Sequence, residues 1–151
     1  MPPTPVKADG KLSLVYELHV TNLHTNNLEL IRVEVMRDGA KRPIATYTDE
    51  ELSSRLAAAT SIRIKLPSDQ PDPRVMGRAM RAAMYMLITV EQQADVPAAL
   101  HHRLFFKSHS GAENSQEVVE GGQVTVNRTA PLVLSAPLLG EGWVAAGGPV
   151  V

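Results

Sequence analysis

The sequence predicts an all-β fold. Apolar and polar residues alternate at period two in several segments, which is the pattern of strands that bury one face. Clusters of Gly, Pro, Asn and Asp separate these segments at regular spacing, and only one segment carries helix-start signals. Together these observations favour an immunoglobulin-like β-sandwich of about seven to nine strands with one short helix. The Cys-Trp-Cys signature of antibody domains is absent, because the chain has no cysteine.

The clearest strand is predicted near the N-terminus, where an apolar residue recurs at every second position: Leu12, Leu14, Tyr16, Leu18 and Val20. A second strand follows a polar turn and is expected to place Ile31, Val33 and Val35 on one face. It ends at an Asp-Gly pair, which is a hairpin signal. Residues 43–47 then form a short third strand.

One segment carries the signals of a helix. Thr48 and Glu51 fit a capping box, in which the two side chains bond backbone amides at the helix start. The acidic residues 49–51 also suit the positive end of the helix dipole. Leu52, Leu56 and several alanines continue the pattern, so we expect a helix of about two or three turns that ends near Ala59.

Strand patterns return after this helix. Predicted strands cover residues 62–66, 81–90, 100–107, 117–120 and 123–128. The region from residue 74 to 90 is ambiguous, since Met76, Met80 and Met84 recur at helical spacing while its Ile-Thr-Val end favours a strand. We assign a strand to 81–90 and expect these methionines and Met86 to fill the core rather than form a soft copper site.

The patterns divide the chain into a flexible Pro-rich arm (residues 1–10), the sandwich domain (11–128) and an apolar Pro- and Gly-rich connector (129–151). The connector holds the only tryptophan, which usually needs a surface to bury against, and it suits neither a helix nor a central strand. We expect it to dock on a partner or to fold back on its own sandwich. Its predicted partner-binding residues are Leu138, Leu139, Trp143 and Val144.

Composition excludes several functional classes. With 15 Lys and Arg against 16 Asp and Glu, nothing predicts a nucleic-acid or anionic-lipid partner. No apolar stretch approaches the roughly 18 residues of a membrane span. The absence of cysteine excludes disulfides, thiolate nucleophiles and Cys-ligated metals. Phosphate-cradling glycine motifs and the nucleophile elbow of hydrolases are also absent, and we expect no cofactor.

Histidines are the remaining candidates for chemistry; the chain has His19, His24, His101, His102 and His109. His101 and His102 are adjacent, so on a strand they point to opposite faces and cannot easily share one ion. A core-facing His102 is expected to donate to a backbone carbonyl. The sequence therefore predicts no catalytic or metal-binding residue. The alternative is a metal-dependent hydrolase that uses His101, His102 or His109 with Glu113.

Several segments carry a resemblance to a known family: Tyr16–Asn22, Leu28–Val35, Pro43–Tyr47 before a Glu-Leu helix, His102–Phe106 and, most specifically, Pro137–Ala145. Over residues 12–146 they resemble the β-rich N-terminal accessory region of bacterial lysostaphin-type (peptidoglycan endopeptidase-like) zinc metallopeptidases. The catalytic pattern of that family, His-x-x-x-Asp with a later His-x-His, is absent here. The resemblance therefore implies an accessory module without the catalytic domain, and no catalytic residue is carried over.

Three functional hypotheses follow. The first is a non-catalytic accessory or interaction module associated with a peptidase-like cell-envelope protein. Its partner would be a neighbouring catalytic domain or an envelope protein, and a periplasmic or extracytoplasmic location is favoured over a cytoplasmic one. The second is the metal-dependent hydrolase. The third is a stand-alone structural or assembly protein that self-associates through a free sheet edge.

Overall fold

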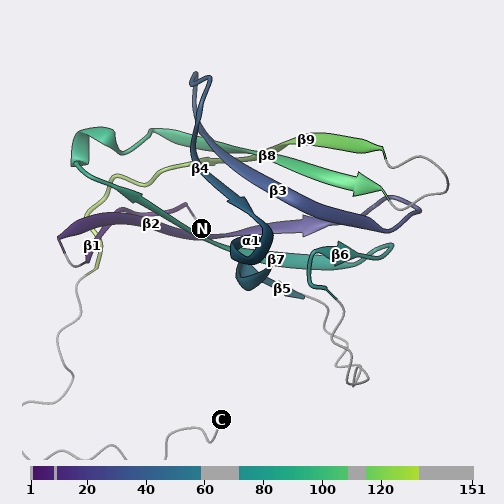
Figure 1. Cartoon of the computed structure of the whole chain (residues 1–151). Coiled ribbons are helices and arrows are strands. Elements are labelled where there is room, and N and C mark those ends of the chain that lie inside the picture. Colours follow the sequence, from purple (N-terminus) through teal and green to yellow (C-terminus); the bar gives the residue numbers. More distant parts are fainter. Residues whose placement is uncertain (1, 9, 59–71, 109–114, 133–151) are drawn as a thin grey trace, which may run out of the picture.

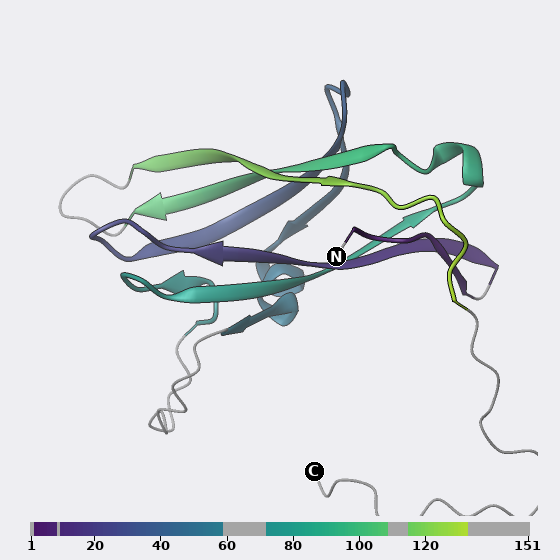
Figure 2. The same cartoon turned by 180° about the vertical axis from the view of Figure 1, so that it is seen from behind.

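A computed structural model describes residues 2–8, 10–58, 72–108 and 115–132 of the chain. Two β-sheets pack face to face (Figures 1 and 2). One sheet has the strand order β1-β2-β7-β5; the other has the order β4-β3-β8-β9, with β6 paired to β3. The predicted all-β sandwich with a short α-helix is confirmed for this part of the chain.

The elements, in chain order, are β1 (Val6–Ala8), β2 (Lys11–Thr21), β3 (Leu28–Arg37), β4 (Pro43–Thr48), α1 (Asp49–Arg55), β5 (Leu56–Ala58), β6 (Val75–Met76), β7 (Arg81–Val90), the 3-10 helix η1 (Gln93–Asp95), β8 (Ala99–Ser108) and β9 (Gln116–Thr125).

The centre of the first sheet is the long antiparallel pair of β2 and β7. The pair stays in register from Leu12 opposite Val90 to Thr21 opposite Arg81. Period-two alternation sends one set of side chains from each strand into the core, as predicted: Leu14, Tyr16 and Leu18 from β2, and Met84, Met86 and Ile88 from β7. Met76 is also buried, and Met80 packs against the core. The methionines therefore fill the interior, as predicted.

Strand β3 contains a bulge that the sequence analysis did not predict. Leu30 lies opposite Phe106, but Arg32 lies opposite Phe105, so the register shifts at Ile31. Ile31 is half-buried, whereas Val33 and Val35 are fully buried. The predicted alternation holds for the two valines but not for Ile31, because an extra residue in one strand changes the phase of the pattern.

Helix α1 is shorter than predicted. Leu52 anchors it in the core, but Leu56–Ala58, predicted as its last turn, form β5 and pair with β7. The predicted capping box is also wrong, because the Thr48 side chain makes no cap hydrogen bond. Glu51 instead pairs with Arg55 at 3.0 Å. The backbone bonds that β7 offers at its edge outweigh the helix propensity of this Leu-Ala-Ala sequence.

Strand β9 runs without a break through Gly121-Gly122, where the sequence analysis expected two separate strands. The irregularity lies in its pairing with β8, whose register shifts between Leu100 and His102, so that His102 is opposite Gly121. A bulge at this point accommodates the glycines without ending the strand.

The N-terminal stretch is paired at two places. Val6–Ala8, which the sequence analysis assigned to an arm, form β1 against Lys11–Ser13. Just before β1, the carbonyl of Pro3 accepts a hydrogen bond from the backbone N–H of Asn127, and Thr4 Oγ1 accepts one from the Asn127 side chain. The chain that leaves β9 is therefore tied to the residues that lead into β1. The predicted strand over residues 62–66 lies outside the described residues.

Candidate functional site

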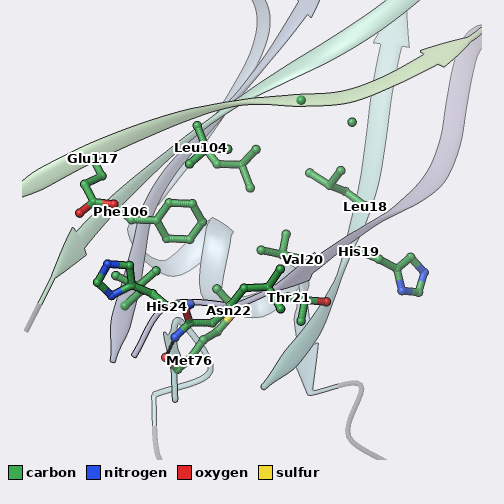
Figure 3. A pocket seen from close by; sticks show the side chains of 15 residues that line it. Leu18, His19, Val20, Thr21, Asn22, His24, Met76, Leu104, Phe106 and Glu117 are labelled. Atoms are coloured by element: carbon green, nitrogen blue, oxygen red, sulfur yellow. Dashed lines mark hydrogen bonds between the residues drawn. The ribbon is translucent and has the colours of Figure 1, made fainter. Parts of the chain in front are cut away.

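One side of the sandwich carries an open groove between β2 of one sheet and β8 and β9 of the other. A hollow of about 360 Å³ lies there, with Leu18 and Val20 on one wall and Leu104 and Phe106 on the other (Figure 3). A second hollow of about 490 Å³ continues along the same strands. Both are lined by Leu18, His19 and Gly122, so together they form one groove, which we call the β2–β9 groove.

The groove is open because no strand among the described residues covers the inner face of β9. Residues that lie opposite each other in an antiparallel pair share a face, so Val119, opposite Leu104, points inwards. Yet Val119 is 49% exposed, as much as its outward-facing neighbour Val118 at 50%. Glu117, opposite the buried Phe106, is exposed too. Inward positions of a complete sandwich are normally covered by the opposite sheet.

Within the described ranges, both strands that border the groove have a backbone edge that is unpaired over much of its length. Strand β1 pairs with β2 only at Lys11–Ser13, and no other strand of the described chain pairs with that edge over residues 14–21. Strand β9 ends its sheet and pairs with β8 alone among the described strands. The unpaired N–H and C=O groups of such edges can bind another extended chain.

Asn22 closes one end of the groove. Its buried side-chain amide donates to the carbonyls of Asn26 and Met76, each at 2.9 Å, and its Oδ1 accepts the backbone N–H of His24 at 2.8 Å. These bonds hold the turn after β2 against β6. They also fix the backbone from which His24 reaches the rim of the groove (Figure 3).

His102 lies beneath the groove and links the two sheets. It is fully buried, with Nδ1 2.9 Å from the Gly122 carbonyl oxygen and Nε2 2.7 Å from the Tyr16 hydroxyl. A carbonyl only accepts, so Nδ1 carries the proton and Nε2 accepts from the Tyr16 O–H. The predicted bond from a core-facing His102 to a backbone carbonyl is present. Burial lowers the pKa of His102 and raises the pKa of Tyr16, so both side chains are neutral near pH 7.

The other described histidines do not converge. His101 is half-buried on the opposite face of β8 from His102, and His19 pairs with Glu17 at 3.0 Å on the exposed face of β2. Within the described residues, no group of three or more His, Cys, Asp or Glu side chains could hold a metal ion. The remaining predicted residues lie outside the described part of the chain: His109, Glu113, Leu138, Leu139, Trp143 and Val144.

Charged side chains surround Phe105 on the outer face of the sheet that contains β8. The guanidinium of Arg32 lies 3.6 Å from the centroid of the Phe105 ring and shields it, so Phe105 is buried although it points outwards. Glu34 pairs with Arg32 and with Arg103, at 3.3 Å each. This network keeps the outer face polar around one aromatic ring.

The sequence analysis missed two apolar surfaces, Val119 in the groove and four exposed side chains on the outer face of the other sheet: Val6, Val15, Tyr85 and Leu87. One signal was present in the sequence. Apolar residues occupy outward positions of β2 and β7, next to the alternating core residues, where a solvent-facing strand usually carries polar ones.

No helix in the described part of the chain is both long and apolar enough to cross a membrane. Comparison of the chain with protein-family models, with curated proteins and with solved structures gave no match.

Proposed function

We propose that this chain is a non-catalytic interaction module that binds an extended segment of a partner protein in the β2–β9 groove. The partner would be a neighbouring catalytic domain or another protein of the cell envelope, associated with a lysostaphin-type peptidase. The resemblance of segments such as Tyr16–Asn22 and Pro137–Ala145 to the accessory region of those enzymes supports this association.

The order of the strands supports an immunoglobulin-like form of the sandwich. In immunoglobulin domains, one sheet has the order A-B-E-D and the other contains C-F-G. Here the order β1-β2-β7-β5 corresponds to A-B-E-D, and β3-β8-β9 corresponds to C-F-G, with β4 as an added strand beside C. In this correspondence the groove lies between strands B and G, beyond the short strand A.

The exposure of the inward-facing Val119 carries the proposal. A guest strand that paired with the edge of β2 over residues 14–21, which no described strand pairs with, would lie opposite β9 and cover Val119. Every second side chain of the guest would face the apolar walls formed by Leu18, Leu104 and Phe106. We therefore expect the bound segment to be extended and to carry apolar residues at alternate positions.

A random peptide library displayed on phage tests this groove. We expect the selected peptides to share an alternating apolar pattern and to lose binding to the Val119→Lys variant, because lysine places a charge on the groove wall. Val118→Lys is the matched control, since Val118 is equally exposed on the same strand but faces outwards. Peptides that bind both variants equally, or a library that yields no binder, would refute the groove as the binding site.

Measuring the zinc content of the purified chain distinguishes the interaction module from the metal-dependent hydrolase. We expect no stoichiometric zinc, because both ring nitrogens of His102 are already bonded and His101 faces the other way. One zinc ion per chain that is lost in a His101→Ala variant would support the hydrolase instead.

A further inference from the structure

The outer face of the β1-β2-β7-β5 sheet carries an apolar patch that is separate from the groove. Val15 of β2 lies opposite Leu87 of β7, and the two side chains are 62% and 46% exposed. Tyr85 lies two residues along β7 on the same face, and Val6 of β1 lies opposite Ser13, next to Val15 on that face. We call these four side chains the outer patch.

The outer patch differs from the corresponding face of the other sheet. There, the one large apolar ring that points outwards, Phe105, is covered by Arg32 and is buried. In the outer patch, no cationic side chain of the described residues stacks on Tyr85, which is 52% exposed. Exposed apolar side chains at neighbouring positions of three strands form the kind of patch that commonly serves as a contact surface.

The described part of the chain ends beyond β1, on the side of this sheet. After β9 the backbone is tied to the residues before β1 through Asn127 and Pro3, and Arg128 donates to the carbonyl of Val96. The stretch from 126 to 132 then runs past β1, away from the β9 layer (Figures 1 and 2). It ends at Leu132, which is exposed and directly precedes the apolar segment of residues 133–144.

We infer that residues 133–144 of the same chain pack on the outer patch, with Leu138, Leu139, Trp143 and Val144 covering Val15, Tyr85 and Leu87. Fully extended, this segment reaches about 40 Å, whereas three neighbouring strands span only about 10 Å. Its attachment beside β1 gives it a high effective concentration at the patch, which favours its own chain over a second copy. Unlike a guest strand in the groove, it needs no free sheet edge, so its prolines are no obstacle.

The fluorescence of Trp143 tests this packing in the full chain, because Trp143 is the only tryptophan. We expect a blue-shifted emission maximum and weak quenching by acrylamide, compared with a synthetic peptide of residues 133–146. Val15→Lys and Leu87→Lys should shift the emission towards that of the peptide and raise the quenching constant. Val118→Lys is the matched control, because it makes the same substitution at an exposed outward valine of the other sheet, and it should leave the Trp143 emission unchanged.

Three results would overturn the inference. The first is wild-type emission equal to that of the free peptide. The second is an emission that Val15→Lys and Leu87→Lys leave unchanged. The third is a blue shift that disappears on dilution, which would assign the contact to a second copy. The groove proposal is tested separately, because Val119→Lys lies on the other side of the sandwich and is expected to leave Trp143 unaffected.

Discussion

At position 122 the chain needs a residue without a side chain. The φ angle of Gly122 is +61°, and a Cβ there would lie 2.9 Å from Leu18 Cδ1 and 3.1 Å from His102 Nδ1. The end of Leu18 can turn aside, but the imidazole ring cannot, because both of its nitrogens are bonded. Gly122→Ala should therefore lower the free energy of unfolding by about 1 to 3 kcal/mol, measured by urea denaturation.

Gly121 is the matched control for this substitution. Its φ is outside the left-handed region, and a Cβ there would meet no atom within 4 Å. Gly121→Ala should change stability by less than about 1 kcal/mol, in either direction. If Gly121→Ala and Gly122→Ala lowered the unfolding free energy equally, the role assigned to Gly122 would be wrong.

At the scale of elements, two substitutions in and before α1 show whether packing or capping stabilises this short helix. Leu52 is fully buried, so Leu52→Ala should cost about 2 to 5 kcal/mol of unfolding free energy. A capping threonine would be worth about 1 kcal/mol, but Thr48 makes no such bond, and Thr48→Ala should cost less than about 0.5 kcal/mol. Thermal and urea denaturation of both variants give the comparison. If Thr48→Ala lowered the unfolding free energy more than Leu52→Ala does, capping by Thr48 rather than the packing of Leu52 would hold the helix.

The same elements show what the sequence can and cannot predict. Strand β7 was predicted with the bounds that it has, because its inward positions are apolar along its whole length. The end of α1 was not, since Leu56–Ala58 suit a helix locally and become a strand only through pairing with β7. The groove was not predictable either. Val118 and Val119 look alike in sequence, and only the lack of a covering strand among the described residues leaves the inward one exposed.

At the scale of the whole molecule, His102 joins the two sheets, and we expect it to make the stability of the fold depend on pH. It is on β8, accepts from Tyr16 on β2, and donates to Gly122 on β9. Burial lowers its pKa in the folded state below the ordinary value of 6.5. The unfolded chain therefore takes up this proton first as the pH falls, and stability that is fully present above pH 6.5 is lost between 6.5 and the folded-state pKa.

We expect the unfolding free energy to fall below pH 6.5 with a slope from this residue of at most about 1.4 kcal/mol per pH unit. His102→Gln removes the titrating group. The variant should have a lower unfolding free energy than the wild type at pH 7.5, but its unfolding free energy should fall less as the pH is lowered. Urea denaturation of both proteins across pH 5 to 8 measures the two slopes. If the His102→Gln profile ran parallel to that of the wild type, the buried imidazole would not be the group that couples protonation to the joining of the sheets.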